Sequence, residues 1–102
     1  MIEIKTTVKA KNEAQHIADA LLNKRKALSV RLKKVHYRYR YRHQIRNTKG
    51  IELNILAPTA NKADIINTIK KLSSGDPHEI IIHKVETTDT VINWCNTECK
   101  YN

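Results

Sequence analysis

The sequence has few of the residues that mark secreted, membrane-spanning or disordered proteins. Its 102 residues include two cysteines, two glycines, two prolines, one tryptophan and no phenylalanine. Two cysteines close to the end of the chain do not make the disulfide framework of a small secreted domain. The longest apolar run is the isoleucine triplet at 80–82, far shorter than a membrane span, and the first residues do not resemble a signal peptide. We therefore expect a cytoplasmic protein with no membrane partner.

Acidic residues are missing from a long central segment. Between Ala20 and Ile51 the chain has eleven Lys and Arg residues and no Asp or Glu, whereas the rest has eight basic and ten acidic side chains. The formal net charge of +9 therefore belongs to this one segment. Such a concentration of positive charge favours a polyanion or another anionic partner, with nucleic acid as one example.

The length and the hydrophobic content of 40% predict a single domain over residues 1–102. The spacing of apolar residues predicts strands over 2–8, from Leu28 onward, over 51–57 and over 78–85, and helices from a capping box at Asn12, around 65–72 and after Thr88. This order, β-α-β-β-α-β plus a C-terminal helix, is that of an α+β ferredoxin-like split βαβ fold. It predicts an antiparallel sheet with helices on one face and a long hairpin between the second and third strands.

Three local patterns refine this prediction. Apolar residues take even positions from Leu28 to Leu32 and odd positions from Val35 to Tyr41, so we expect a β-bulge or bend near Lys33-Lys34. The polar stretch 46–50 is typical of a turn. The isoleucine triplet at 80–82 predicts a last strand that is buried on both faces.

Short matches to one family run along nearly the whole chain, in order and without a large insertion. They are Thr6-Thr7, the helix residues from Glu13-Ala14 to Arg25, Ala27 to Val30, Tyr39-Arg40-Tyr41, Glu52-Leu53, Thr59, Glu79-Ile80-Ile81, Val85-Glu86 and Ile92-Asn93-Trp94. Together they resemble the CutA family, which is named for divalent-cation tolerance. The resemblance implies a homotrimer of ferredoxin-like protomers in which the long hairpin reaches a neighbouring subunit. The predicted interface residues are Val35, Tyr37, Tyr39, Tyr41 and Trp94.

The sequence departs from the family pattern where a metal site would be sought. The Trp-Glu-Gly-Lys element becomes Tyr41-Arg42-His43-Gln44, so His43 replaces a glycine and the charge of the hairpin is reversed. The cysteine of an Ala-Cys-Val-Asn stretch is absent, and residues 73–80 lack the family's His and Tyr. The family's metal ligands therefore do not transfer residue by residue.

A divalent cation such as copper or zinc is nevertheless the candidate cofactor that the resemblance implies. Imidazole, thiolate and carboxylate groups are the donors that such ions prefer. The candidate metal ligands are His78, Glu79, His83, Cys95 and Cys99. On a regular strand His78 and His83 point to opposite faces, and two cysteines four residues apart on a helix are neighbours that do not by themselves close a site.

Arg38, Arg40 and Arg42 alternate with tyrosines and are predicted to project from one face of a strand. Three interpretations stay open for this pattern. The tyrosines pack at a subunit interface while the arginines are solvated or paired with acids of a neighbour; the arginines bind a polyanion; or they bind a small anionic ligand in clefts between subunits, as in PII-type signalling proteins.

Motifs for catalysis are missing from the sequence. It has no Gly-rich phosphate loop, no nucleophile-elbow motif and no Ser/His/Asp arrangement recognisable by local spacing. We therefore predict a protein that acts by binding or assembly and is not an enzyme.

Overall fold

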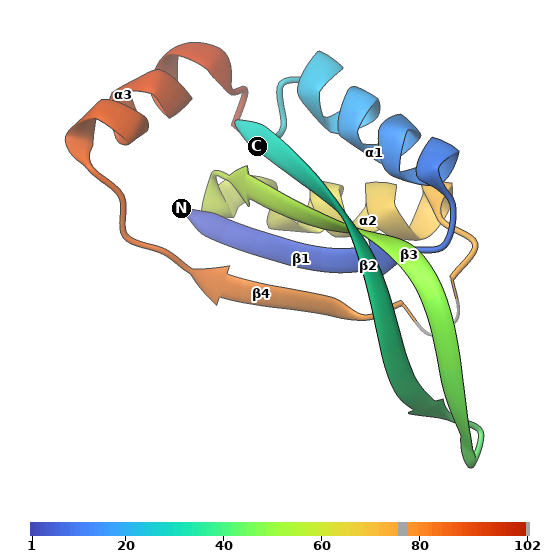
Figure 1. The fold of residues 1–102 in the computed structure, drawn as a ribbon. Coiled ribbons are helices and arrows are strands. Elements are labelled where there is room, and N and C mark those ends of the chain that lie inside the picture. Colours follow the sequence, from blue (N-terminus) through green and yellow to red (C-terminus); the bar gives the residue numbers. More distant parts are fainter. Residues whose placement is uncertain (76–77, 102) are drawn as a thin grey trace.

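The computed structural model describes residues 1–75 and 78–101 (Figure 1). These residues form β1 (Ile2–Val8), α1 (Lys11–Asn23), β2 (Ser29–Tyr41), β3 (Gln44–Ala57), the 3-10 turn η1 (Thr59–Asn61), α2 (Lys62–Leu72), β4 (Ile80–Lys84) and α3 (Asp89–Glu98). All strand pairs are antiparallel, and the strand order is β2-β3-β1-β4. The predicted α+β ferredoxin-like fold is confirmed. None of the helices in the described ranges is long and apolar enough to cross a membrane.

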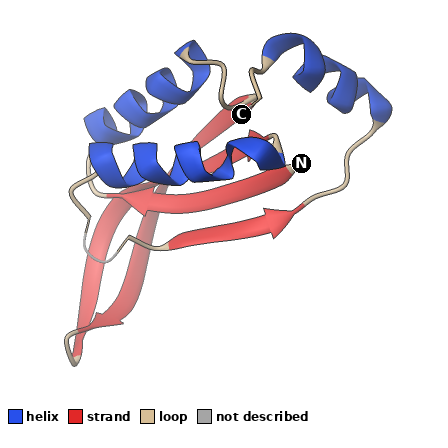
Figure 2. Cartoon of the chain, turned by 180° about the vertical axis from the view of Figure 1, so that it is seen from behind, coloured by secondary structure: helices blue, strands red, loops and turns tan. Residues whose placement is uncertain are grey.

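Helices α1 and α2 cover one face of the sheet, and the core lies between them and the strands (Figure 2). Strict alternation in β1 turns every second side chain toward the helices, so the strand is buried at positions 2, 4, 6 and 8. The two helices contribute apolar residues at helical spacing, as the sequence predicts. The buried cluster comprises Ile2, Ile4, Val8, Ala14, Ile17, Leu21, Ala27, Leu53, Ile55, Ala57, Ile65 and Ile69.

The two long helices begin and end close to their predicted limits. Helix α1 starts at Lys11 with Ala10 as its N-cap and has no side-chain cap, so the predicted capping box at Asn12 is wrong. Glu13 of the first turn instead accepts hydrogen bonds from the Ser74 backbone N–H and hydroxyl, both at 2.8 Å. The predicted stop of α2 is confirmed at Leu72; Asp76 and Pro77, which belong to that prediction, lie outside the described residues.

The β2–β3 hairpin is a continuous ladder that extends beyond the rest of the sheet (Figure 1). Its register runs without interruption from Ser29 opposite Leu56 to Tyr41 opposite Gln44. The predicted bulge near Lys33-Lys34 is therefore wrong. Side chains alternate between the two sides along the whole ladder. In the first part of β2 the apolar side chains lie on the side that faces the helices, and in the second part they lie on the opposite side. The hairpin bends away from the body in the same region (Figure 1).

The chain reverses direction at Arg42 and His43, and the predicted turn at 46–50 is wrong because those residues belong to β3. Both turn residues have left-handed backbones, with φ of 51° and 64°, as two-residue hairpin turns require. Gly50 has a different role. A Cβ atom at this position would lie 2.7 Å from the Val8 carbonyl oxygen, so glycine permits the close approach of β3 to the end of β1.

Strand β4 pairs only with β1 and forms one edge of the sheet. It is shorter than the predicted strand over 78–85. Ile80 packs against the core, whereas Ile81 and Ile82 are 41% and 37% exposed. The predicted burial on both faces is therefore wrong within one chain: among residues 1–75 and 78–101, no further strand pairs with β4 on its outer side.

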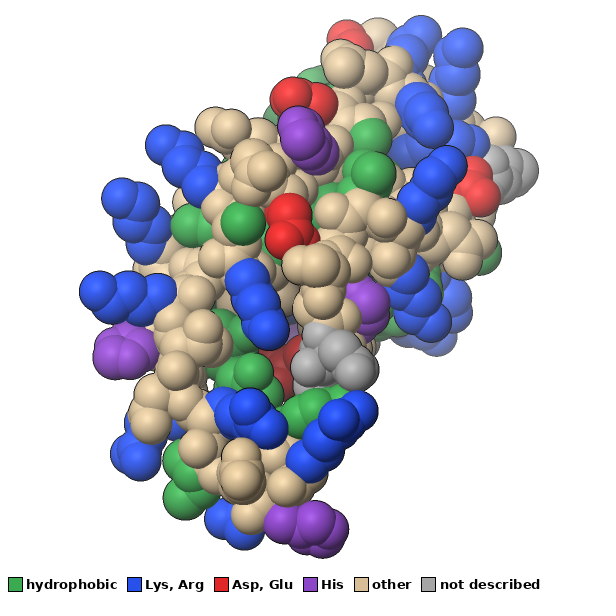
Figure 3. Space-filling model, turned by 90° about the vertical axis from the view of Figure 1, so that its right-hand side faces the viewer, with side chains coloured by type: hydrophobic (Ala, Val, Ile, Leu, Met, Phe, Trp, Pro, Cys, Tyr) green, Lys and Arg blue, Asp and Glu red, His purple; other side chains and the backbone are tan. Residues whose placement is uncertain are grey.

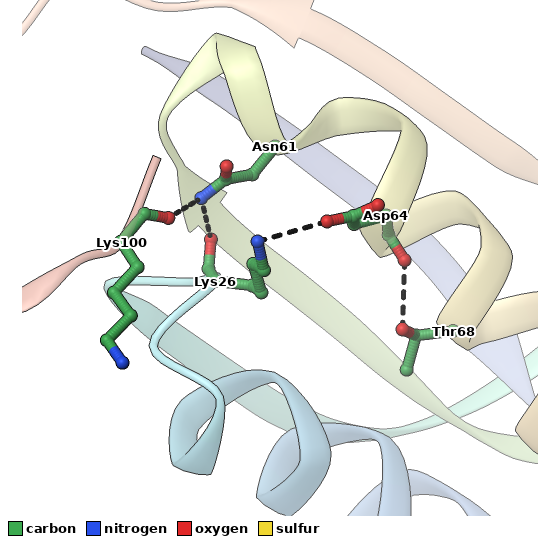
Figure 4. A network of polar contacts seen from close by, with 5 residues as sticks. All are labelled: Lys26, Asn61, Asp64, Thr68 and Lys100. Carbon is green, nitrogen blue, oxygen red and sulfur yellow. Dashed lines mark hydrogen bonds and ion pairs between the residues drawn. The ribbon is translucent and has the colours of Figure 1, made fainter. Parts of the chain in front are cut away.

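Asn61 ties the C-terminal segment to the body (Figure 4). It is fully buried, and its Nδ2 donates hydrogen bonds to the carbonyl oxygens of Lys26 at 3.0 Å and Lys100 at 2.8 Å. Beside it, Lys26 Nζ lies 3.1 Å from an Asp64 carboxylate oxygen. The Asp64 carbonyl accepts a hydrogen bond from the Thr68 hydroxyl at 2.9 Å. Buried polar groups are stabilising only when paired in this way.

Arg25 holds the end of α3. Its backbone is left-handed, with φ of 58°, and its carbonyl accepts a hydrogen bond from the Lys100 backbone N–H at 2.8 Å. Its guanidinium donates to the carbonyls of Glu98 at 2.6 Å and Thr97 at 2.9 Å. A cation at a helix C-terminus pairs with carbonyls that have no partner inside the helix. Arg25, which follows α1, is thereby joined to the C-terminal end of α3.

Candidate functional site

The distal hairpin, residues 35–50, has two chemically different faces. Its tyrosine face consists of the half-buried residues Val35, Tyr37, Tyr39 and Tyr41. Tyr37 and Tyr39 are stacked, with ring centroids 5.2 Å apart and an interplanar angle of 19°. Burial, together with the neighbouring Tyr39 and the charge of Glu79, raises the pKa of Tyr37. The tyrosine face is therefore partly desolvated and lies close to the segment that leads into β4.

The opposite side of the ladder forms the cationic face, which consists of the exposed residues Lys34, His36, Arg38 and Arg40. Their direct partners on β3 are Ile51, Lys49, Asn47 and Ile45, none of which is acidic. Figure 3 shows Lys, Arg and His side chains around the hairpin end of the molecule, while most of the visible acidic side chains lie toward the other end. The cationic face is suited to an anionic partner.

Arg42 does not extend the row formed by Arg38 and Arg40. Strand β2 ends at Tyr41, and Arg42 lies in the left-handed turn, where its guanidinium carbon is 5.2 Å from the centroid of the Tyr41 ring. The prediction of three arginines on one strand face is corrected to two, because the hairpin closes four residues earlier than the sequence suggests. The contact with Tyr41 is a cation–π interaction at the tip.

Large apolar side chains are exposed on both edges of the sheet and on α3. Trp94 on α3 is 50% exposed, although Val91 and Cys95 of the same helix pack inward. Ile45 near the hairpin tip is 56% exposed, and Ile81 and Ile82 are exposed on β4. The sequence analysis did not identify these three isoleucines as surface residues. Ile81 and Ile82 lie on the edge strand β4, whereas Ile45 lies on β3 beyond the residues that pair with β1.

The candidate metal ligands lie in separate places. The imidazole of His78 is 3.3 Å from the Ser73 carbonyl oxygen in the segment before β4, and Glu79 next to it is exposed. His83 lies on β4 opposite Glu3 of β1, so these two side chains share a face. Within residues 1–75 and 78–101, no three His, Cys, Asp or Glu side chains form a group able to hold a metal ion. The donors of a single chain therefore do not fit a closed divalent-cation site.

Cys95 and Cys99 form a buried thiol pair with no disulfide between them. They pack against Leu28 in a second small cluster. Burial, followed by a hydrogen bond to Cys95, raises the pKa of Cys99 to about 12. The hydrogen bond to Cys95 is also the main reason that the pKa of Tyr101 is raised to about 12. A metal ligand or nucleophile must be a thiolate, so the raised pKa of Cys99 suits this thiol to packing.

The fold is shared with solved CutA structures. CutA1 from Pyrococcus horikoshii has a TM-score of 0.90 and 22% identity, with 98% of this chain and 99% of that chain covered. CutA from Xylella fastidiosa has a TM-score of 0.90 and 24% identity, with 97% of both chains covered. The PII-like protein CutA from Nostoc sp. PCC 7120, in its apo form, has a TM-score of 0.90 and 17% identity, with 100% of both chains covered.

Sequence comparison supplies the family as well as the fold. No curated protein matches the chain. The model of one protein family, however, matches residues 2–98, which is nearly the entire chain. The match includes the hairpin in which the charge is reversed and the β4 segment in which the family's His and Tyr are missing. The chain therefore belongs to the family of the CutA1 divalent ion tolerance protein.

Proposed function

We propose that the chain is a homotrimeric protein of the divalent-cation response that acts by binding and assembly, without catalysis. The observation that carries the proposal is the exposure of large apolar side chains at both sheet edges and on α3, namely Ile45, Ile81, Ile82 and Trp94. Monomeric proteins rarely leave apolar sheet edges uncovered, because such edges pair with other chains. A second copy of the chain would bury them.

The two ends of the sheet differ, which favours a ring. One end is the long β2–β3 hairpin and the other is the short β4. Contact between the hairpin of one copy and β4 of the next is a head-to-tail contact, and such contacts close into rings when the rotation permits. Within one chain the charge of Glu79 contributes to the raised pKa of Tyr37. The tyrosine face therefore lies near the start of β4, and both would be close to the contact between two copies.

Oligomeric assembly would also supply the metal donors that one chain lacks. His83 and Glu3 are neighbours on β4 and β1, and they provide two of the three or four ligands that zinc or copper needs. Since β4 is an edge strand, a further donor from an adjoining copy would reach this pair. The binding role is favoured over catalysis because both thiols are buried and burial raises the pKa of Cys99 to about 12, which makes that thiol a poor nucleophile.

The oligomeric state tests the proposal directly. Light scattering coupled to size exclusion should give three times the 11.8 kDa mass of one chain. The double variant Ile81→Lys/Ile82→Lys should give a smaller species. The matched control is Leu22→Lys, which changes a residue of similar exposure on α1. A monomeric wild-type chain, or an unchanged mass in the double variant, would contradict the assembly.

The metal role needs its own measurement. Calorimetric titration with Cu²⁺ and Zn²⁺ should show saturable binding to the assembled protein. Binding should weaken in His83→Ala and in Glu3→Gln, and it should not change in His16→Ala, which removes an exposed imidazole on α1. Equal binding by all variants would show that the metal binds to unspecific surface histidines.

A second candidate function rests on the cationic face. Arg38 and Arg40 are exposed, and neither has an acidic partner across the ladder. Arginines two residues apart on one strand face are placed to contact successive phosphates. Anisotropy of a labelled single-stranded oligonucleotide at several salt concentrations should show a steep loss of affinity with salt, and Arg38→Gln/Arg40→Gln should abolish binding. No binding at low salt excludes this function.

A further inference from the structure

A pocket lies within a single chain at the point where the β2–β3 hairpin leaves the sheet. Its volume is about 390 Å³, within the range of small-molecule sites. Figure 1 shows that β1 ends and α1 begins beside the base of the hairpin. Residues from the start of α1, from β2 and from β3 line the pocket. Its lining includes four lysines, Lys9, Lys11, Lys34 and Lys49, together with His36.

Positive groups come to this pocket from three separate segments. Lys9 and Lys11 flank the N-cap of α1, Lys34 and His36 lie on β2, and Lys49 lies on β3. His36 is directly opposite Lys49 in the ladder. The His36 imidazole and the Lys49 ammonium are therefore placed to donate hydrogen bonds to the same bound anion.

Acidic groups nearby do not neutralise these lysines. Among the residues that the structure describes, none of the four lysines in the lining forms an ion pair. Glu13 is the nearest acid along the chain, and its carboxylate is bonded to Ser74. Glu52 lies opposite Lys33 in the ladder, on the side away from Lys34. The pocket therefore keeps an uncompensated positive potential.

The start of α1 adds to this potential. The helix has thirteen residues, its N-cap is Ala10, and no side chain caps it. The backbone N–H groups of a first turn have no partner inside the helix, and the helix dipole places partial positive charge there. Phosphate groups commonly bind to such an arrangement when cationic side chains converge on it.

The floor of the pocket is apolar and continues into a second groove. Val35, Gly50 and Ile51 line the pocket between the lysines. The groove, of about 160 Å³, shares Lys11, Lys34 and Ile51 with the pocket and adds Lys33. An apolar floor strengthens the interaction of the lysines with a bound anion, because it lowers the local dielectric constant.

We propose that this pocket binds a small molecule carrying two or more phosphate groups. Several lysines around one compact cavity match a ligand with several negative charges better than a single carboxylate or phosphate. The pocket is formed within one chain and does not include Arg38 or Arg40. The inference therefore depends neither on oligomerisation nor on binding of a polyanion by the two arginines.

Inorganic tripolyphosphate is a suitable first probe, with orthophosphate for comparison. Calorimetric titration of the whole chain at low salt should give one tripolyphosphate per chain, bound at least tenfold more tightly than orthophosphate. In Lys34→Gln/Lys49→Gln the affinity for tripolyphosphate should fall at least tenfold. The matched control is Arg38→Gln/Arg40→Gln, which removes the same charge from the same hairpin and should retain the affinity within about twofold.

Circular dichroism establishes that each variant is folded before titration. If the first double variant does not fold, Lys9→Gln/Lys11→Gln removes two cations from the opposite wall and should also lose at least tenfold in affinity. Equal losses in the lysine and arginine variants would overturn the proposal, since they would show a response to net charge only. Absence of tripolyphosphate binding, combined with loss of assembly in Lys34→Gln/Lys49→Gln, would assign the pocket to an acidic side chain of a second copy and also overturn it.

Discussion

The body of the molecule and the distal hairpin are stabilised by different means. In the body, β1, α1, α2, the second half of β3 and Ala27 before β2 bury twelve apolar side chains in one cluster, and none of residues 35–50 belongs to it. The distal hairpin relies on its own ladder, the stacked pair Tyr37–Tyr39, the contact of Arg42 with Tyr41 and the close contact at Gly50. An isolated two-stranded hairpin is marginally stable in water. The hairpin is therefore the part of the fold that gains most from a neighbouring molecule.

Charge divides the molecule along the same line. The body contains the buried network of Asn61 and the ion pair Lys26–Asp64, whereas the distal hairpin carries cations with no acidic partner across the ladder. The contacts of the body stabilise the fold. The hairpin and its base combine exposed charge, exposed apolar groups and a pocket, and the binding functions that we propose depend on them. Substitutions that act differently on the two regions can test this division.

The largest expected effect is in the core of the body. Ile55 is fully buried between the sheet and the helices, so Ile55→Ala should lower the free energy of unfolding by about 2–5 kcal/mol. The control in the hairpin is Tyr39→Ala, which should cost less because Tyr39 is half-buried. Urea denaturation at one fixed chain concentration measures both. Equal losses would show that the hairpin is as much a part of the cooperative core as β3.

The second-largest effect on stability is expected at Gly50, where the distal hairpin joins the body. In Gly50→Ala the new Cβ atom would lie 2.7 Å from the Val8 carbonyl oxygen, and this backbone atom cannot move aside as a side chain would. We expect a loss of about 1–3 kcal/mol, as for other overpacked positions. Thr48→Ala, two residues away on the same strand face, should change stability by less than half as much. A neutral Gly50→Ala variant would show that the hairpin can shift relative to β1.

The sequence predicts the body well because each element there obeys a local rule. Alternation identifies β1, and helical spacing identifies α1 and α2. The hairpin is harder to predict from the sequence, because two different structures produce the same sequence pattern. A bulge and an unbroken ladder whose apolar side switches both place apolar residues first at even and then at odd positions. Only the register, with Ser29 opposite Leu56 and Tyr41 opposite Gln44, distinguishes them.

Two further errors have a shared cause. The predicted turn includes Gly50, whereas this residue permits a contact with Val8, which is distant in the sequence. The isoleucine triplet predicts a strand buried on both faces, whereas β4 pairs on one side only among the described residues. In both cases the position of the residue in the tertiary structure decides its surroundings, and local sequence rules do not contain that information. The pocket at the base of the hairpin was also not predicted, because it brings Lys9 and Lys11 together with Lys34 and Lys49 from separate elements.

A smaller effect is expected at high pH in the second cluster. Burial and the contact with Cys95 raise the pKa of Cys99 to about 12, above the value of about 8.5 for a free thiol in the unfolded chain. Between these values the unfolded state releases the proton and the folded state keeps it, so stability falls as pH rises from about 9 toward 12. Urea midpoints over this range should fall less steeply in Cys99→Ala. An identical slope would show that Cys99 is accessible to solvent.

The smallest effect is expected at the hairpin tip. A variant there tests the stability of the distal hairpin separately from that of the body. Arg42 and His43 both have left-handed backbones, which Asn-Gly adopts with less strain than Arg-His. Arg42→Asn/His43→Gly should therefore stabilise the ladder by up to about 1 kcal/mol, despite losing the contact of Arg42 with Tyr41. Slower amide hydrogen exchange at 38–47, with unchanged exchange in β1, is the expected result. Thr48→Gly should have the opposite effect, because glycine weakens a strand interior. If the tip variant also slows exchange throughout β1, the hairpin and the body open as one unit and the division drawn between them fails.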